Sequence, residues 1–362
     1  MKLLMISTDH RLFMAEDLVA RQKGYFEGHE VTVWILTDKV QGEKTVDGIR
    51  LIATGGTNKF SSLWRGYRMA FSDMTDYRFV TTQDVLFTGL LGWFLAKKKS
   101  IPFFVQLHGD YLDNPLWIKQ RRLNVVLNAL GKALLKRATA IRVVSARIKD
   151  DIVPRYGIDA SHVLSLPICT DLSTFSAQGS SEANKRNLFF VGRLIEEKDP
   201  LLFCRVAARV MKDDPTVNAV IAGEGVLMDA MREVFAKAGL SDRARFLGNV
   251  NAGTLTHWYR SSIALVHTAP WEGWGMPMIE SIACGCPVVT TDTGCAGEAI
   301  RHEKEGLVYA VGDEEGLYQG TKKLCEDQAY RDALAANGIT EAQNWSYDAR
   351  KGDLMNFYQR YL

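Results

Sequence analysis

The 362-residue chain lacks the sequence features of several common protein classes. Its most apolar run, residues 85–96, stops at three lysines and is too short to cross a bilayer, which takes about 20 residues. Neither half has Gly-x-Gly-x-x-Gly after its first expected strand, and the nearest candidate, Ile221-Ala-Gly-Glu-Gly225, lacks the third glycine. This argues against a dinucleotide-dependent dehydrogenase. A Walker-type lysine loop, internal repeats and low-complexity segments are also missing.

Cysteine is scarce, and its spacing does not suit zinc. The six cysteines lie in apolar or tight-turn contexts, at positions 169, 204, 284, 286, 295 and 325. The closest pair, Cys284-Gly-Cys286, is not a zinc-ligand spacing, and no His/Cys cluster accompanies it. We therefore expect reduced core thiols in a cytoplasmic protein. The apolar run at the N-terminus ends by Ser7, which predicts a first buried strand rather than a signal peptide.

The charge is nearly balanced overall but uneven along the chain. The 44 Lys and Arg and 42 Asp and Glu give a net charge of +2. Residues 1–170 hold 24 basic and 16 acidic residues, whereas residues 171–362 hold 20 and 26. A basic half and an acidic half are expected to meet different partners. The length suits two domains, and a 47% hydrophobic, 24% charged composition is that of a globular protein.

Short apolar segments alternate with amphipathic ones, which is the pattern of α/β proteins. The apolar runs are continuous, which favours parallel sheets covered on both faces. We expect strands at 3–6, 30–35, 49–53, 79–82, 103–107, 140–144, 188–191, 217–221, 244–246, 264–267, 288–290 and 306–309. Helix-like segments lie between the strands of the first half, for example at 16–25 and 117–136, and helices are expected in the second half at 201–211, 226–238, 254–260, 277–283 and 315–325.

A polar stretch of small residues interrupts this pattern and reads as a linker, residues 169–187. It separates two doubly wound α/β domains, 1–168 and 188–344. Ligands of such sheets bind outside the carboxyl ends of the strands, and two facing domains would form a cleft there.

Two cations follow the first strand of the second half, in Phe190-Val-Gly-Arg-Leu-Ile-Glu-Glu-Lys-Asp-Pro200. The strand ends at Gly192, and Arg193 and Lys198 precede a helix expected to begin near Pro200. An anion at this strand end would meet a guanidinium fork and a compact ammonium, which suits a phosphate. The alternative is that both are solvated surface charges.

Two glutamates flank a glycine-broken loop in Pro270-Trp-Glu-Gly-Trp-Gly-Met-Pro-Met-Ile-Glu280. Gly273 and Gly275 would let a ligand approach the backbone ahead of a helix, whose free N–H groups form an anion site. Glu272 on the loop and Glu280 one turn into the helix would accept hydrogen bonds from sugar hydroxyls. For Glu280, a carboxylate that only interacts with the helix dipole is an equal alternative.

A third candidate lies in the first half, in Val105-Gln-Leu-His-Gly-Asp110. A histidine at the end of an apolar strand points toward the ligand side in this class of sheet. A structural role for His108 is the alternative. The other six histidines show no metal-ligand spacing, and we expect structural roles for them.

At these residues the sequence resembles the retaining glycosyltransferases of family 4, which have the GT-B fold of two Rossmann-like domains. The resemblance covers essentially the whole chain. It is carried by Val191-Gly-Arg-Leu-x3-Lys198, Glu272-Gly-Trp-Gly-Met-Pro-Met-Ile-Glu280, Ala283-Cys-Gly-Cys-Pro-Val-Val289, Gly294-Cys-Ala-Gly-Glu298, His108-Gly and Arg142-Val-Val-Ser145. Residues 345–362 resemble the terminal helix that crosses back to the first domain of such enzymes.

The resemblance assigns each residue a role. Arg193 and Lys198 match the positions that hold the donor diphosphate and offset charge on the departing nucleotide. Glu272 matches the carboxylate that contacts the donor sugar, Glu280 the ribose-binding glutamate, and His108 a histidine near the transferred sugar. The implied catalytic set is His108, Glu272, Arg193 and Lys198, and the implied donor-binding set is Gly192, Gly223, Val250, Gly273, Gly275, Met276, Pro277 and Glu280.

The family mechanism implies front-face attack in which the leaving phosphate takes the acceptor proton, so no dedicated base is assigned. Glu272 would be a nucleophile by glycosidase logic, but the resemblance implies a positioning role. It also implies no metal and no cofactor, and no Asp-x-Asp occurs. The substrate would be a nucleoside-diphosphate sugar, linked to UDP or GDP with UDP slightly favoured.

The acceptor is expected to be a saccharide, lipid-linked at the inner face of a membrane, and no nucleic-acid partner is expected. Residues 116–137 separate apolar and basic residues onto two helical faces, as helices on anionic bilayers do. The alternative is a domain helix with a solvated basic face. Two other functions stay open: a nucleotide-sugar epimerase of similar fold and a catalytically silent binding protein.

Overall fold

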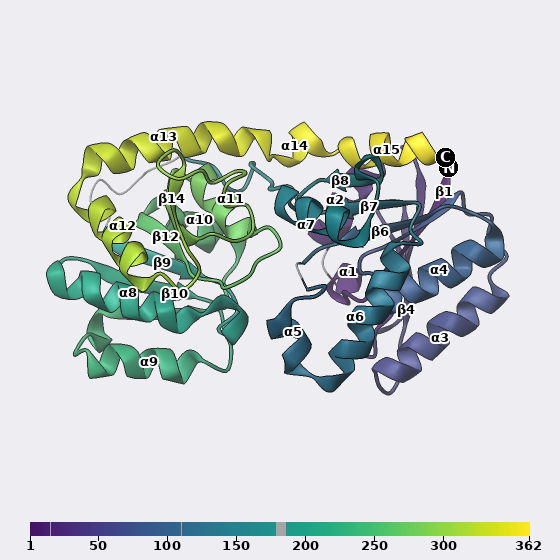
Figure 1. The fold of residues 1–362 in the computed structure, drawn as a ribbon, viewed down its shortest axis with the longest axis horizontal. Coiled ribbons are helices and arrows are strands. Elements are labelled where there is room, and N and C mark those ends of the chain that lie inside the picture. The colour runs from purple at the N-terminus through teal and green to yellow at the C-terminus, as the bar shows by residue number, and fades with distance from the viewer. Residues whose placement is uncertain (15, 110, 179–185) are drawn as a thin grey trace. The chain divides into compact units, whose positions relative to one another are not determined.

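The computed structural model describes residues 1–14, 16–109, 111–178 and 186–362 (Figure 1). The chain divides into two compact units. Unit 1 consists of Met1–Pro167 together with Lys351–Leu362, and unit 2 consists of Ile168–Arg350. Part of the predicted linker, residues 179–185, lies outside the described residues, as does Asp110 in the His108 motif.

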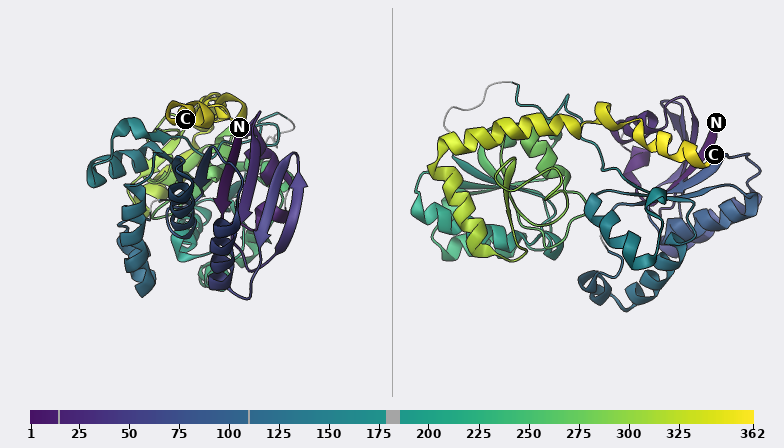
Figure 2. Two further views of the ribbon diagram at one scale, coloured as in Figure 1. Left: turned by 90° about the vertical axis from the view of Figure 1, so that its right-hand side faces the viewer. Right: turned by 45° about the horizontal axis from the view of Figure 1, so that its top comes forward.

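Unit 1 is built on an eight-stranded sheet within its described residues, in the order β3-β4-β2-β1-β5-β6-β7-β8. Figure 2 (left) shows the purple strands from the N-terminal part of this sheet side by side. The strands are β1 Lys2–Ser7, β2 Glu30–Ile35, β3 Gln41–Val46, β4 Ile49–Thr54, β5 Phe79–Thr82, β6 Phe103–Leu107, β7 Ala140–Val143 and β8 Val163–Ser165. The helices are α1 Arg11–Met14, α2 Glu16–Tyr25, α3 Lys59–Ser72, α4 Phe87–Lys99, α5 Pro115–Gln120, α6 Arg122–Leu135, α7 Ala146–Tyr156 and α15 Asp353–Tyr358.

Unit 2 holds a six-stranded parallel sheet within its described residues, in the order β11-β10-β9-β12-β13-β14. Its strands are β9 Asn187–Val191, β10 Asn218–Ala222, β11 Ala244–Gly248, β12 Ser262–His267, β13 Val288–Thr291 and β14 Gly306–Tyr309. Its helices are α8 Pro200–Asp213, α9 Met228–Lys237, α10 Ala252–Arg260, α11 Met276–Ala283, α12 Glu314–Glu326, α13 Gln328–Asn344 and α14 Tyr347–Arg350. The centre of the sheet is apolar: the residues of β12, for example, are all buried, as expected for a parallel sheet covered on both faces.

The predicted helix 117–136 is wrong as a single element. Arg121 is extended (φ −150°, ψ 137°) and separates α5 from α6. The Asn124 side chain donates to the Trp117 carbonyl at 2.7 Å and satisfies an acceptor that the break leaves open. The sequence did not reveal this break, because neither glycine nor proline marks residues 120–122.

Three further features differ from the predicted elements. Strands β3 and β8 were not expected, and β3 pairs antiparallel with β4 at the sheet edge. Helix α13 was also not expected. The terminal segment 345–362 is not one helix, because a turn at Lys351 and Gly352 separates α14 from α15, and glycine is a poor helix former. Within unit 1, α15 places Tyr358 in a stack with Phe104 of β6, with ring centroids 4.0 Å apart.

Candidate functional site

The connection from β9 to α8 carries the two predicted phosphate-binding cations. Gly192 follows β9 with φ +155°, and a 3-10 turn, Glu196–Lys198, leads to Pro200 at the first turn of α8. Arg193 is 67% exposed, and its guanidinium pairs with Glu197 at 2.8 Å. Lys198 is only 20% exposed. The two cations therefore differ: Arg193 reaches into solvent, whereas Lys198 is held against the protein.

Glu272 is the partner of Lys198, and the Lys198 ammonium contacts its Oε2 atom directly. His267, the last residue of β12, places Nε2 at 3.5 Å from the same oxygen. The Gly273 N–H donates to Oε1 at 3.1 Å. Burial disfavours the charged carboxylate, but the hydrogen bond from His267 and the positive charge of Lys198 outweigh it and lower the pKa of Glu272 to about 2. Glu272 is thus a fixed, ionised acceptor at neutral pH.

The loop after Glu272 is shaped by glycines. Gly275 has φ +87° and is the N-cap residue of α11, where no side chain caps the helix. A Cβ at this position would lie 2.3 Å from Cε of Met278 and 3.3 Å from Cγ of Glu272. Met276 and Pro277 form the first turn of α11. The backbone therefore passes close to Glu272 and leads directly into a helix N-terminus, an arrangement that favours anions.

Glu280 lies one turn into α11 and is 9% exposed. The hydroxyl of Tyr259, on α10, donates to Glu280 Oε2 at 3.0 Å. Burial raises the pKa of Glu280 to about 7, and the Tyr259 hydrogen bond offsets only part of that rise. The two glutamates of the loop motif therefore lie in opposite electrostatic environments.

The ends of three neighbouring strands meet at glycines. Gly223, after β10, has φ +131°, and a Cβ there would lie 1.9 Å from the Gly192 carbonyl oxygen. The Gly223 N–H donates to the Gly248 carbonyl at 2.8 Å, which ties β11 to the same edge. Val250 follows two residues after β11 and is partly buried. The predicted donor-binding positions Gly223 and Val250 thus flank the β9–α8 connection that carries the cations.

His108 follows β6 in unit 1, whereas the other predicted site residues lie in unit 2. The end of this strand is fixed by Arg142, whose guanidinium donates to Gln106 Oε1 at 2.8 Å and to the carbonyls of Leu166 and Pro167. His108 is therefore presented at the carboxyl end of a firmly held strand of its own unit.

Sequence reasoning missed two residues that hold the glutamates. His267 was assigned a structural role, yet it contacts Glu272 through Nε2, and Thr290 lies 3.4 Å from its Nδ1. Tyr259 carried no sequence signal that would distinguish it from a core aromatic residue. The position of His267 at the carboxyl end of a buried strand, the same signal that singled out His108, would have identified it.

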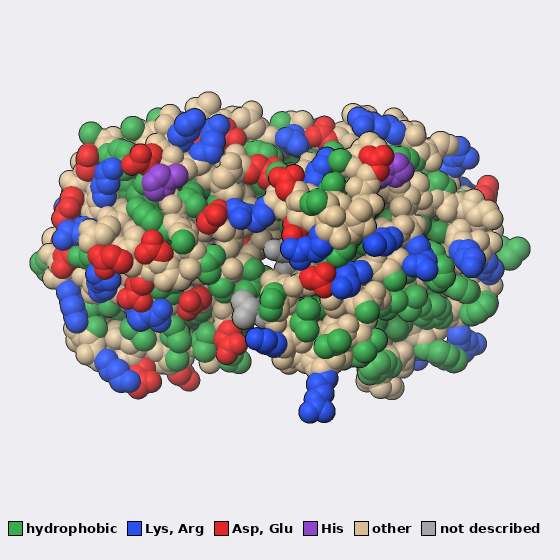
Figure 3. Space-filling view, viewed as in Figure 1, with side chains coloured by type: hydrophobic (Ala, Val, Ile, Leu, Met, Phe, Trp, Pro, Cys, Tyr) green, Lys and Arg blue, Asp and Glu red, His purple; other side chains and the backbone are tan. Residues whose placement is uncertain are grey.

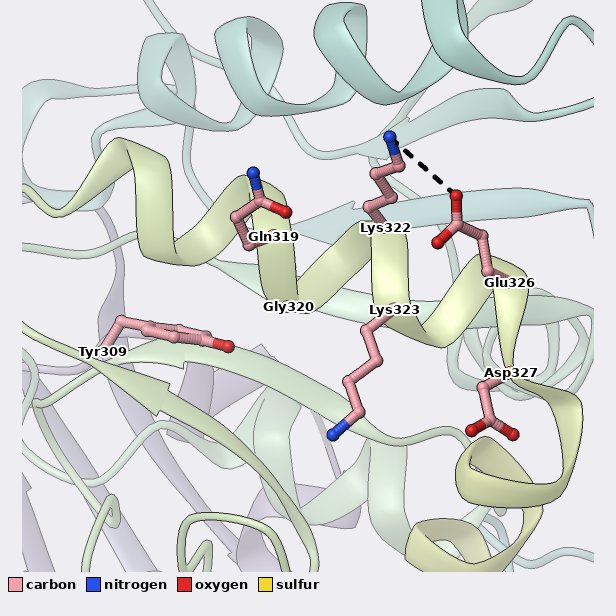
Figure 4. A pocket seen from close by; sticks show the side chains of 7 residues that line it. All are labelled: Tyr309, Gln319, Gly320, Lys322, Lys323, Glu326 and Asp327. Carbon is pink, nitrogen blue, oxygen red and sulfur yellow. Dashed lines mark ion pairs between the residues drawn. The ribbon is translucent and has the colours of Figure 1, made fainter.

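A pocket of about 340 Å³ lies elsewhere in unit 2, between β14 and α12 (Figure 4). Its lining residues are Tyr309, Gln319, Gly320, Lys322, Lys323, Glu326 and Asp327. Lys322 pairs with Glu326 across one turn of α12 at 3.9 Å. None of the predicted site residues lines this pocket, so it is separate from the candidate site.

Among the described residues, no cluster of three or more His, Cys, Asp or Glu side chains could hold a metal ion. Within the same residues, no helix combines the length and apolarity needed to cross a membrane.

Two models of known protein families match this chain, one over each half. Residues 15–173 match the family described as Glycosyltransferase Family 4, and residues 173–341 match Glycosyl transferases group 1. The chain belongs to the family 4 glycosyltransferases, a retaining family of sugar transferases with the GT-B fold that use nucleotide-sugar donors.

Individual relatives are distant. The D-inositol 3-phosphate glycosyltransferase of Streptosporangium roseum is 24% identical over 290 residues, 75% of this chain and 67% of that protein. The lipopolysaccharide core biosynthesis mannosyltransferase LpsB of Rhizobium meliloti is 29% identical over 221 residues, 58% of this chain and 62% of that protein. The matches to curated relatives span between 45% and 70% of their lengths.

Solved structures share the fold over the whole chain. Sucrose-phosphate synthase from Thermosynechococcus elongatus aligns with a TM-score of 0.83 at 19% identity and covers 100% of this chain and 99% of its own. Anabaena Alr3699/HepE, solved in complex with UDP and glucose, aligns with a TM-score of 0.78 at 17% identity and covers both chains fully.

Proposed function

We propose that this enzyme transfers a hexose from a UDP-sugar to a saccharide acceptor that is linked to a lipid, with retention of configuration. The observation that carries the proposal is the contact between Lys198 and the buried, ionised Glu272 beside a glycine-lined helix N-terminus. Such a site offers positive charge to a diphosphate and a carboxylate to sugar hydroxyls within a few ångströms.

One structural neighbour supports the donor, and the names of one relative and one neighbour support the class of acceptor, whereas several other relatives are D-inositol 3-phosphate glycosyltransferases. HepE has been solved with UDP and glucose and with UDP-glucose. LpsB is named for lipopolysaccharide core biosynthesis, and the structural neighbour WaaB is a lipopolysaccharide outer core galactosyltransferase. These names favour UDP and a lipid-linked saccharide for this chain.

In the proposed complex the donor diphosphate lies between Arg193, Lys198 and the amides at the start of α11. Lys198 then shares its charge between the diphosphate and Glu272, whose His267 contact keeps the carboxylate ionised. Glu272 accepts hydrogen bonds from the sugar, and Glu280 from the ribose diol. Gly223 and Val250 flank the base, and His108 lies near the transferred sugar. No protein base is needed, since the departing diphosphate takes the proton from the hydroxyl of the acceptor saccharide.

The test measures free UDP released from UDP-sugars with and without a saccharide acceptor. We expect Lys198→Ala to lower kcat/KM by roughly 10²–10³-fold, the range seen when one donor to a developing oxyanion is removed. Glu272→Ala should also lower kcat/KM, because it removes the proposed acceptor for the sugar hydroxyls and the partner of Lys198. Arg193→Ala, which removes a more exposed contact, should cost less. Lys237→Ala is the matched control, because this lysine is exposed and pairs with Glu233 on α9, away from the site residues.

Each rival function gives a different result in the same assay. An epimerase would convert the sugar without releasing UDP, and a silent binding protein would bind the donor without turnover. If Lys198→Ala and Glu272→Ala both turned over like the Lys237→Ala control, the proposed site would be wrong.

A further inference from the structure

Helix α3 in unit 1 exposes large aromatic side chains, although Leu63, Tyr67 and Met69 pack against the core. Its buried face carries the small residues Ser62, Gly66 and Ala70. Gly66 packs so closely that a Cβ there would lie 2.7 Å from Leu36. The opposite face carries large aromatic residues: Phe60 is 75% exposed and Trp64 59% exposed. The core therefore explains why small residues face inward, but not why aromatic residues face outward.

The exposed aromatic residues form one stripe. Phe60, Trp64 and Phe71 recur at spacings of four and seven residues, which places them on one side of the helix. Phe71 is 63% exposed, and Met74, just beyond the helix, extends the stripe. Scattered single apolar residues on a surface are ordinary, but a contiguous apolar stripe marks an interaction surface.

Basic side chains flank this stripe. The Arg68 guanidinium lies 4.9 Å from the Trp64 ring centroid, and the Lys98 ammonium lies 5.8 Å from that of Phe71. A separate basic pair lies at Trp93 of the neighbouring helix α4, whose ring centroid is 5.5 Å from the Lys97 ammonium and 5.8 Å from the Arg137 guanidinium. Figure 3 shows hydrophobic and basic side chains mixed over the region where Figure 1 places α3 and α4.

Acidic residues are scarce around this surface. Helices α3, α4, α5 and α6 contain no Asp or Glu. The acidic residues that follow α3 are Asp73, which pairs with Lys99 at 3.4 Å, and Asp76. The surface is therefore both aromatic and positively charged.

We propose that the aromatic stripe of α3, with the basic residues of α3 and α4, docks unit 1 onto an anionic lipid bilayer. Aromatic rings favour the boundary between headgroups and acyl chains, and each Lys or Arg near an anionic surface strengthens binding about fivefold. A second copy of this chain fits less well, because it would bring two basic surfaces together. The stripe also protrudes on the face of a helix, which suits insertion into headgroups.

This surface differs from the segment that the sequence singled out, residues 116–137. Helix α6 directs Leu127, Leu134 and Leu135 into the core, so most of its apolar face already has partners. The exposed apolar residues of α6 lie at its start, at Leu123, Val125 and Val126. The two surfaces can be tested separately, and the test of either is independent of catalysis.

The experiment is co-sedimentation of the full chain with phosphatidylcholine vesicles that contain or lack phosphatidylglycerol. We expect binding only to the anionic vesicles, weakened as salt rises from about 0.1 M to about 1 M. Phe60→Ser/Trp64→Ser should reduce that binding about tenfold or more, since both side chains would otherwise leave water. Arg68→Gln/Lys97→Gln should reduce it mainly at low salt. Donor hydrolysis without vesicles should be unchanged in both variants, because these residues are not part of the donor site.

Two matched controls make the result decisive. Val226→Ser removes an equally exposed apolar side chain from unit 2 and should bind vesicles like the unsubstituted chain. Leu123→Ser/Val126→Ser removes the exposed apolar residues of α6, and this variant should still bind anionic vesicles. The emission of Trp64, isolated by difference from a Trp64→Phe variant, should shift to the blue on anionic vesicles.

Four outcomes would overturn the proposal. They are the absence of binding to anionic vesicles, unchanged binding by Phe60→Ser/Trp64→Ser, loss of binding only in the α6 variant, and a lipid-free dimer that Phe60→Ser/Trp64→Ser dissociates. The last outcome would assign the stripe to a second copy of the chain.

Discussion

At the scale of single residues, two glutamates of one short motif lie in opposite electrostatic environments. Glu272 has a cation and a histidine beside it, and its pKa falls to about 2. Glu280 accepts a hydrogen bond from the neutral Tyr259 hydroxyl, and burial raises its pKa to about 7. One carboxylate is therefore charged near neutral pH, and the other titrates there.

This difference predicts that donor affinity depends on pH through Glu280. A ribose diol donates hydrogen bonds and needs the ionised carboxylate, so UDP-sugar affinity should fall by up to about tenfold per pH unit below the pKa of about 7. Calorimetry with an intact UDP-sugar measures this, because its diphosphate diester does not titrate in that window. In Glu280→Gln the affinity should be lower and flat with pH. An equally steep profile in Glu280→Gln would assign the dependence to another group.

The free energy of unfolding depends on pH through Glu280 in the opposite direction to donor affinity. Because the folded-state pKa of Glu280 lies above its ordinary value of 4.5, the folded protein retains the proton that the unfolded chain releases. Its contribution to the free energy of unfolding therefore declines as pH rises from about 4.5 to about 7. Glu280 thus makes the fold less stable at the pH where it is proposed to bind ribose best.

At the scale of elements, the site depends on how closely the ends of β9, β10 and β11 approach each other. Gly223 sits where the Gly192 carbonyl leaves no room for a Cβ, and it also hydrogen-bonds to Gly248. The connection that carries Arg193 and Lys198 is thus held by backbone contacts that involve glycine on both sides.

We expect Gly223→Ala to displace this connection. The left-handed φ of +131° and a Cβ 1.9 Å from an oxygen together should cost about 2–5 kcal/mol of stability or force the loop to move. Either result should weaken UDP-sugar binding. The measurements are urea unfolding and calorimetric titration.

Gly239→Ala is the matched control, because Gly239 also has a positive φ, +73°, but nothing within the described residues lies within 4 Å of the place where its Cβ would stand. Gly239→Ala should lower the free energy of unfolding by only about 1 kcal/mol and leave donor binding intact. Equal effects of the two substitutions would show that the close approach at Gly192 does not matter.

At the scale of the whole molecule, the chain divides its proposed tasks between two units. The residues proposed to bind the nucleotide lie in unit 2, and His108, with the aromatic and basic surface of α3 and α4, lies in unit 1. The uneven charge along the sequence follows the same division, with the basic half in the unit proposed to meet a bilayer.

This division predicts how ligands change thermal stability. UDP at about 100 times its Kd should stabilise the folded state by about 2.7 kcal/mol and raise the Tm of the unit that binds it by roughly 5–10 °C. GDP should have a smaller effect if UDP is the natural nucleotide. His108→Ala should keep the UDP shift but lose turnover of the UDP-sugar. Loss of the UDP shift in His108→Ala would show that unit 1 takes part in nucleotide binding.

Much of the fold could be predicted from hydrophobic patterning. The predicted strands 30–35, 79–82 and 103–107 coincide with β2, β5 and β6, because fully buried parallel strands are continuous apolar runs. Strand β3 was invisible to this reasoning: its sequence Gln-Gly-Glu-Lys-Thr-Val is largely polar, and it is an exposed antiparallel edge strand. The break at Arg121 was equally hidden, since neither glycine nor proline marks it.

Local patterns along the chain were enough to predict the α/β class and the family and to propose the site residues, because short-range order encodes strand ends, glycine turns and helix starts. What surrounds those residues depends on tertiary packing. Packing set Lys198 and His267 against Glu272, left Glu280 with Tyr259 in a buried position, and turned the aromatic residues of α3 outward. Those contacts join residues up to 74 positions apart, so the pKa values and the exposed surface that depend on them are properties of the folded chain rather than of sequence pattern.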